Sequence, residues 1–273
     1  MTTPGSSPTT GDVIAVLEQL YPPDLAEDWD AVGLAVGSAS APVSQLLYTV
    51  DVTEEVVREA VTLGADLVVA HHPLLLRPVR AVDLDSPKGR VVAELLRHGI
   101  TLYVAHTNAD VPADGVVDSL AAALGLQQTR PLRPGRSGGL GRVGTLPGGF
   151  TLGQFAERAA AVLPTTGGGV RVSGDVDRPV RTVAVQAGAG DDLLAEARGT
   201  GADVYLTSDL RHHPASEARA WGGPALVDVP HWAAEALWLP VARRLVAARL
   251  AERGLTVPAA VSTVCTDPWN SRV

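Results

Sequence analysis

The chain has 273 residues, a net charge of −8, a hydrophobic fraction of 46% and a single cysteine, Cys265. This length can bury a large core, the negative charge argues against electrostatic binding to nucleic acid or an anionic membrane, and one cysteine excludes an intrachain disulfide. No apolar stretch approaches the roughly 20 residues of a membrane span, and residues 1–10 lack the features of a secretory signal. We therefore expect a soluble, cytoplasmic protein.

The first half of the chain alternates between helix and strand patterns, which is typical of an α/β protein with largely parallel strands. Two helix starts carry clear signals: Thr53 precedes Glu54 and Glu55, and Ser86 precedes Pro87. Helices are expected over 10–20, 53–64, 86–99 and 114–124, and strands over 45–50, 67–70 and 100–105.

The sequence between Gln127 and Gly149 becomes rich in Arg, Pro and Gly, which predicts a boundary inside the chain. A long final helix over 231–253 is expected to kink at Pro240. Further helices are expected over 151–163, 191–198 and 215–221, and strands over 170–172, 180–187, 203–207, 225–229 and 256–264. We predict two layered α/β domains with largely parallel sheets: residues 1–128 with 230–273 as a metal-binding domain, and residues 129–229 as the second.

Two adjacent histidines, His71 and His72, follow a short apolar run that is typical of a buried parallel strand. Side chains at this point lie at the carboxyl edge of a sheet, where open α/β folds bind ligands. Because neighbours in an extended segment point to opposite sides, the pair suits two metal ions with one histidine each. The alternative for an isolated pair is a structural role, with hydrogen bonds to loop backbone.

Other histidines recur at strand ends. His106 and Asp110 follow a strand, and His231 and Glu235 lie at positions i and i+4 of a helix start, where they share one face. His98 stands apart in the last turn of a helix, where a positive charge is favourable. Imidazoles with carboxylates suit Zn, Mn, Fe or Ni rather than Ca or Mg alone. The candidate ligands, for two divalent ions between the domains at the strand ends, are His71, His72, Asp110, His231 and Glu235; the candidates for proton transfer are His106, His212 and His213.

Two glycine patterns do not predict a nucleotide cofactor. Residues 139–144 read Gly-Leu-Gly-Arg-Val-Gly, but they follow a loop rather than a strand and no helix is expected after them. Residues 188–190 precede Asp191 and Asp192, whose carboxylates would repel a phosphate. Cys265 falls in an apolar strand pattern and is interpreted as structural.

Over most of its length the chain resembles the GTP cyclohydrolase 1 type 2 homologues, also called Nif-three-like dinuclear-metal-centre hexameric proteins. The resemblance departs from the usual pattern at Ala31, Ser208 and Pro230, none of which is a proposed ligand. It rests on the order and spacing of Trp29-Asp30, Val32-Gly33-Leu34, Asp51-Val52-Thr53, Ala70-His71-His72-Pro73, His106-Thr107-Asn108-Ala109-Asp110, residues 139–144, residues 201–207, His212-His213, and His231 with Glu235.

The resemblance implies a two-domain α/β subunit without the extra domain that some members carry, a toroidal homohexamer and a dinuclear metal site. The implied ligands are the same five residues, with Asp110 or Glu235 as the bridge. The family's name implies a hydrolase that acts on GTP: a metal-bound hydroxide attacks C8 of the purine, the imidazole ring opens and formate leaves. His106, His212 or His213 would move the protons.

Two other interpretations stay open. Paired ions also stabilise in-line displacement at phosphorus, which a dimetal phosphoesterase uses, and Arg211 is the obvious phosphate contact for that chemistry. A non-catalytic metal-binding or regulatory protein is the third interpretation; a closed coordination sphere favours it, and an open position favours an enzyme. The expected partners are a small nucleotide and further copies of the chain, not a membrane or nucleic acid.

Overall fold

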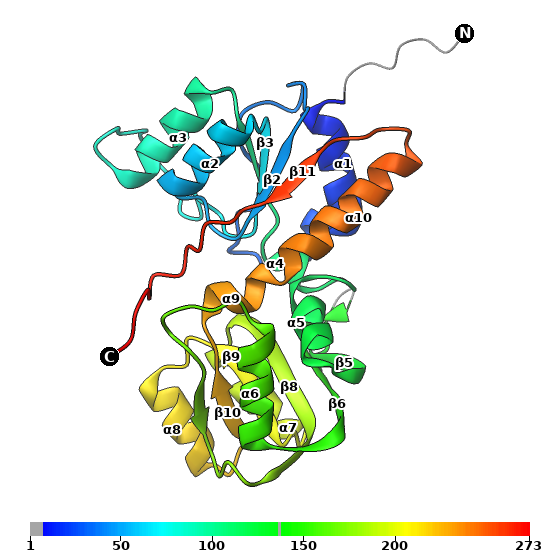
Figure 1. Ribbon diagram of the computed structural model, residues 1–273, viewed down its shortest axis with the longest axis vertical. Helices are drawn as coiled ribbons and strands as arrows, with labels where there is room; N and C mark the ends of the chain where they lie inside the picture. The colour runs from blue at the N-terminus through cyan, green and yellow to red at the C-terminus, as the bar shows by residue number, and fades with distance from the viewer. Residues whose placement is uncertain (1–7, 136–137) are drawn as a thin grey trace. The chain divides into compact units, whose positions relative to one another are not determined.

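The computed structural model describes residues 8–135 and 138–273, and its contacts divide the chain into two compact units, each built on one sheet (Figure 1). The first unit comprises Met1–Ala109 and Leu239–Thr266. The second comprises Asp110–Trp238 and Asp267–Val273. The expected two-domain α/β class is confirmed.

The sheet of the first unit has the strand order β1-β4-β3-β2-β11, and only β1 runs antiparallel to its neighbour. Every residue of β2, β3 and β4 is buried, because helices α2 and α3 cover one face and α1 and α10 the other (Figure 1). The strands are β1 (Gly33–Val36), β2 (Leu46–Thr49), β3 (Leu67–Ala70), β4 (Thr101–Val104) and β11 (Ala259–Val261); the helices are α1 (Thr10–Leu20), η1 (Pro23–Leu25), α2 (Glu54–Leu63), α3 (Pro87–Arg97), α4 (Thr107–Asp110) and α10 (Trp238–Glu252).

The sheet of the second unit has the order β5-β6-β8-β9-β10-β7 and is mixed, since only the β8–β9 and β9–β10 pairs are parallel. Helices α7 and α8 pack on one face of this sheet (Figure 1). Helices α5, α6 and α9 contact strands β6 to β9, and α5 also contacts α6 and α9. The strands are β5 (Gln127–Arg133), β6 (Leu140–Thr151), β7 (Arg171–Ser173), β8 (Pro179–Ala189), β9 (Val204–Ser208) and β10 (Ala225–Asp228); the helices are α5 (Val116–Leu124), α6 (Leu152–Val162), η3 (Asp191–Leu193), α7 (Leu194–Gly199), α8 (His212–Ala220) and α9 (His231–Ala236).

The expected helix signals form as caps. Thr53 accepts a hydrogen bond from the Val56 amide, and Ser86 accepts one from the Gly89 amide. Thr151 forms the expected reciprocal capping box at the start of α6. None of the helices in the described parts of the chain combines the length and apolar character needed to cross a membrane.

The segment expected to be a boundary, residues 127–149, instead contains the antiparallel strands β5 and β6. Strand β5 lies at the sheet edge and its first four residues are exposed, so charged and polar residues replace the usual apolar alternation. Helix α5, which the sequence interpretation assigned to the first domain, packs on β6 and β8 of the second sheet.

Two C-terminal expectations are wrong in detail. The helix over 231–253 is two helices, α9 and α10, separated at Leu237 rather than kinked at Pro240. Pro240 is the third residue of α10, where its missing amide hydrogen leaves no helical bond unmade. Cys265 lies beyond β11 and is exposed, not held in a strand.

Glu59 of α2 anchors the chain that follows β11 within the first unit. Its carboxylate accepts hydrogen bonds from the Thr263 amide at 2.9 Å, from Thr263 Oγ1 at 2.8 Å and from Ser262 Oγ. Burial raises the pKa of Glu59, but these hydrogen bonds outweigh it and hold the pKa below its ordinary value. The resulting stabilisation is present above the unfolded-state pKa and is lost as the pH falls through the lowered value.

We expect Glu59→Gln to lower the free energy of unfolding by about 1 kcal/mol at neutral pH. The difference from the unsubstituted protein should shrink as the pH falls through the lowered pKa of Glu59, where its carboxyl becomes protonated. Urea unfolding across this range measures both values, with Glu55→Gln as the control on the exposed face of α2. A difference that does not change with pH would contradict the assignment.

Candidate metal centre

Three histidines of the first unit lie together beyond the carboxyl ends of two strands. His71 and His72 follow β3, and His106 lies two residues beyond β4, the parallel neighbour of β3. The ring centroids are 5.0 Å apart for His71 and His72, 5.1 Å for His71 and His106, and 5.5 Å for His72 and His106. A ring nitrogen from each lies within 4.8 Å of the other two, so the three could hold a metal ion.

His71 and His72 come directly after β3, which ends at Ala70, and their amides still donate to the Thr49 carbonyl at 3.0 Å and the Val50 carbonyl at 2.8 Å. Both rings join His106 in one group, which we call the histidine cluster. The sequence interpretation placed His106 among the proton-transfer candidates and did not consider it as a further nitrogen donor beside the other two.

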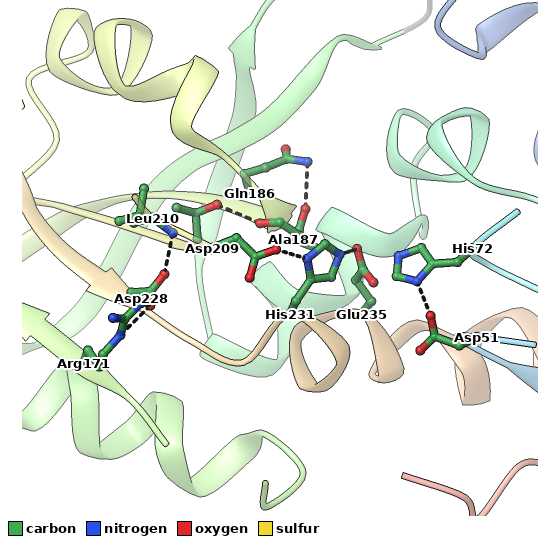
Figure 2. A network of polar contacts seen from close by, with 12 residues as sticks. Asp51, His72, Arg171, Gln186, Ala187, Asp209, Leu210, Asp228, His231 and Glu235 are labelled. Carbon is green, nitrogen blue, oxygen red and sulfur yellow. Dashed lines mark hydrogen bonds and ion pairs between the residues drawn. The ribbon is translucent and has the colours of Figure 1, made fainter. Parts of the chain in front are cut away.

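Each ring of the histidine cluster is fixed through Nδ1 by an oxygen atom. His71 Nδ1 is 2.9 Å from the Ala105 carbonyl, His72 Nδ1 is 2.7 Å from Asp51 Oδ1, and His106 Nδ1 is 2.8 Å from Asp30 Oδ1. Figure 2 shows the His72–Asp51 pair. When Nδ1 donates to an oxygen, the neutral tautomer carries its lone pair on Nε2, and this is the usual arrangement of metal-binding histidines.

Asp30 remains a carboxylate although its side chain is fully enclosed. Burial raises its pKa, but hydrogen bonds from His106, the Thr107 hydroxyl and the Ala31 amide outweigh burial and hold the pKa well below its usual range. Asp51 accepts a second hydrogen bond, from Thr266 Oγ1. Both aspartates belong to motifs that the sequence singled out, but only the structure shows what they orient.

In the second unit, His231 and Glu235 meet across the first turn of α9, as their spacing predicts. His231 Nε2 is 2.9 Å from Glu235 Oε1, and His231 Nδ1 is 2.7 Å from Asp209 Oδ2 (Figure 2). Burial lowers the pKa of His231, but the two carboxylates outweigh burial and raise it to about 11. The surroundings of this ring therefore favour a cation, a property that also suits a bound metal ion.

The backbone of β8 comes close to this pair at Gly188. A Cβ atom there would lie 2.6 Å from Glu235 Oε1 and 3.2 Å from His231 Nε2. The φ angle of Gly188 is +75°, and its carbonyl accepts a hydrogen bond from Thr207 Oγ1 at 3.0 Å. Glycine is therefore required at this position both by backbone conformation and by space.

The glycine pattern of residues 139–144 supports the chain next to Asp110. Arg142 is buried and pairs with Asp118 of α5, while its guanidinium donates to the Val111 carbonyl at 2.9 Å and the Gly141 carbonyl at 2.8 Å. Positive φ angles of +81° at Gly139 and +61° at Gly141 shape this turn. The pattern thus encloses an arginine that fixes the residue after Asp110, and no helix follows it.

The five predicted ligands divide between the two units: His71 and His72 belong to the first, and Asp110, His231 and Glu235 to the second. Asp110 and Glu235 are both buried, with only 4% of Glu235 exposed. Within each unit these side chains, imidazoles fixed at Nδ1 in both and buried carboxylates in the second, are of the kinds that a divalent first-row metal accepts as ligands. The residues present therefore fit the metal that the sequence predicts.

The remaining candidates, for proton transfer and for phosphate contact, lie exposed on the second unit. His212 and His213 lie exposed in the first turn of α8, with ring centroids 5.1 Å apart. The guanidinium of Arg211 is paired with Asp191, so its charge is already compensated. Proton transfer by His212 or His213 stays a prediction.

The chain thus has two α/β units whose histidines and carboxylates beyond strand ends could hold metal ions. The chain belongs to the Duf34/NIF3 (NGG1p interacting factor 3) family, whose sequence pattern matches residues 8–268. This confirms the resemblance found in the sequence.

Curated relatives match along nearly the whole chain. The GTP cyclohydrolase 1 type 2 homolog of Streptomyces coelicolor is 48% identical, covering 97% of this chain and 95% of the relative. The Mycobacterium bovis protein of the same name is 33% identical, covering 95% and 96%. That alignment spans 368 residues against 273 in this chain, so the mycobacterial relative carries additional residues.

Solved structures share the fold. A Bacillus cereus protein related to NIF3 is 28% identical with a TM-score of 0.91, covering 97% of this chain and 99% of that one. A Staphylococcus aureus hypothetical protein is 26% identical with a TM-score of 0.90, covering 98% and 100%. The two-domain α/β architecture is therefore that of the family.

We expect Asp51→Ala to weaken Zn²⁺ binding by about 10- to 100-fold, because the His72 ring loses the oxygen that fixes Nδ1. Isothermal titration calorimetry measures the affinity, and circular dichroism checks that the fold is retained. Asp24→Ala, an exposed carboxylate in η1, is the control and should bind as the unsubstituted protein does. Equal affinities in all three proteins would argue against a role for the His72–Asp51 pair.

Gly188 and Gly201 form a matched pair for testing the close approach to Glu235. Their φ angles are +75° and +71°, but nothing lies within 4 Å of a Cβ at Gly201. Alanine at either position should lower the free energy of unfolding by about 1–2 kcal/mol through backbone strain. Only Gly188→Ala should also weaken Zn²⁺ binding, because it displaces Glu235; an equal effect on binding in both variants would refute this.

Proposed function

We propose that the protein is a metal-dependent hydrolase that binds two divalent ions and acts on a small nucleotide. The observation that carries the proposal is the fixing of four imidazoles, those of His71, His72, His106 and His231, by oxygens at Nδ1. A structural strand-end histidine needs no such shared arrangement, whereas a metal site does. The proposed ligands are His71, His72, Asp110, His231 and Glu235.

Two divalent ions, when bound, acidify a water molecule and stabilise negative charge that develops on the substrate. Zn, Mn, Fe and Ni all suit the proposed donor set. Other residues of the chain orient the proposed ligands. Asp51 and Asp209 hold the rings of His72 and His231, and Arg142 holds the backbone after Asp110. These supports are formed within each unit.

His106 is our candidate for proton transfer. Its Nδ1 is bound to the enclosed carboxylate of Asp30, so a proton accepted at Nε2 would produce an imidazolium next to a fixed negative charge. Such a pair suits general acid–base catalysis. The His106 ring lies against the rings of His71 and His72, so proton transfer by His106 would take place beside two proposed ligands.

We propose a nucleotide substrate, and GTP in particular, because of the names of the relatives. The Streptomyces coelicolor and Mycobacterium bovis proteins are both named GTP cyclohydrolase 1 type 2 homolog. We therefore propose purine ring opening with release of formate as the reaction to test first. A homohexamer and a cytoplasmic location belong to the same proposal; light scattering of the purified protein measures the former.

We expect the protein loaded with Zn²⁺ or Mn²⁺ to release formate from GTP, as measured by chromatography and a formate assay. Glu235→Gln and His72→Ala should lose bound metal and turnover together. His106→Gln should keep its metal and lose turnover by about 10²- to 10⁴-fold, because only proton transfer is removed. His98→Gln, at the exposed end of α3, is the control and should behave as the unsubstituted protein.

Unchanged turnover in Glu235→Gln would contradict the hydrolase proposal. Hydrolysis of generic phosphodiesters to a phosphomonoester and an alcohol, without formate from GTP, would favour a dimetal phosphoesterase instead. Arg211, the arginine that would contact phosphate in that alternative, is already paired with Asp191. Metal binding without turnover of either substrate would favour a regulatory protein.

A further inference from the structure

Trp29 presents an exposed aromatic ring beside the histidine cluster. It lies in the turn between η1 and β1, and 59% of its surface is exposed. Its ring centroid is 5.9 Å from that of His106, with an angle of 78° between the planes, so the two rings meet edge to face. The same His106 ring lies against His71 and His72, so Trp29 borders the cluster.

The turn that carries Trp29 is held rigidly to the start of α4. The Asp30 amide donates to the Glu27 carbonyl at 2.9 Å, and the Glu27 amide donates to Thr107 Oγ1 at 3.0 Å. The Asp30 side chain is enclosed and accepts hydrogen bonds from His106 and Thr107. Backbone on both sides of Trp29 is therefore fixed while its ring remains in solvent.

A large ring held in place but left exposed is suited to stacking, because little conformational freedom remains to be lost when a flat ligand binds. Tryptophan buries a large area with well-defined geometry and needs no charge to do so. Every nucleic-acid base has a flat aromatic face that can stack on such a ring. A neutral platform also suits a base better than it suits the phosphates of a nucleotide.

We propose that Trp29 is the stacking platform for the purine base of the substrate. The identity of this ligand rests on the proposed function, in which the base itself, rather than its phosphates, reacts beside the cluster. The bicyclic indole matches a bicyclic purine in area, and its contact with His106 sets a stacked base next to the proposed proton-transfer residue.

The test compares binding of GMP and of ribose 5-phosphate to the metal-loaded protein by isothermal titration calorimetry. Trp29→Ala should weaken GMP binding by about 10- to 100-fold, and Trp29→Phe should retain most of the affinity. Ribose 5-phosphate, which has no base, should bind all variants equally. Trp221→Ala is the matched control, because Trp221 is 74% exposed and contacts Arg198 in the second unit.

Three results would overturn the inference. GMP binding that is absent in the unsubstituted protein, or unchanged in Trp29→Ala, would remove the platform. An equal loss of GMP and ribose 5-phosphate would show general damage to the site. A change of oligomeric mass in Trp29→Ala with unchanged GMP affinity would assign the ring to a protein contact.

The inference and the hydrolase proposal fail separately. GMP binding that depends on Trp29 without any turnover of GTP supports the platform and contradicts the hydrolase. Turnover of GTP with the same KM in Trp29→Ala and Trp221→Ala supports the hydrolase and overturns the platform.

Discussion

The candidate metal centre depends on one repeated interaction, the hydrogen bond between a histidine Nδ1 and an oxygen supplied by another segment of the chain. It occurs at His71, His72, His106 and His231, with distances from 2.7 to 2.9 Å. Each bond selects a tautomer and restrains a ring that would otherwise rotate. Three of the four oxygens come from aspartates, whose charge favours a cation at the ring that they hold.

The strand order within each unit places these oxygens beside the histidine rings. Asp51 follows β2 and Ala105 follows β4, on either side of β3, whose carboxyl end carries His71 and His72. In the second unit, Asp209 follows β9 with a φ angle of +57°, and Gly188 lets β8 approach Glu235 without a side chain between them. Parallel strands thus align ligands and their supports at one edge of each sheet.

The features that the sequence predicted correctly are local. Helix caps at Thr53 and Ser86 and the contact between His231 and Glu235 arise within a few residues of chain, so spacing alone reveals them. The partners of the rings are distant: 21 residues separate Asp51 from His72, and 76 separate Asp30 from His106. No periodicity connects such positions. Strand β5 was missed because an exposed edge strand with polar and charged residues lacks apolar alternation, and the interior strand β6 was missed because its glycines and proline are typical of a loop.

We propose that His71, His72, Asp110, His231 and Glu235 hold two divalent ions. A crystal structure of the Zn²⁺-loaded protein, with anomalous data collected at the zinc edge, tests it most directly. We expect two anomalous peaks per chain, each bound by Nε2 of these histidines, with Nδ1 of each ring still bound to its oxygen. A single peak, ligation through Nδ1, or ions bound away from these five residues would contradict it.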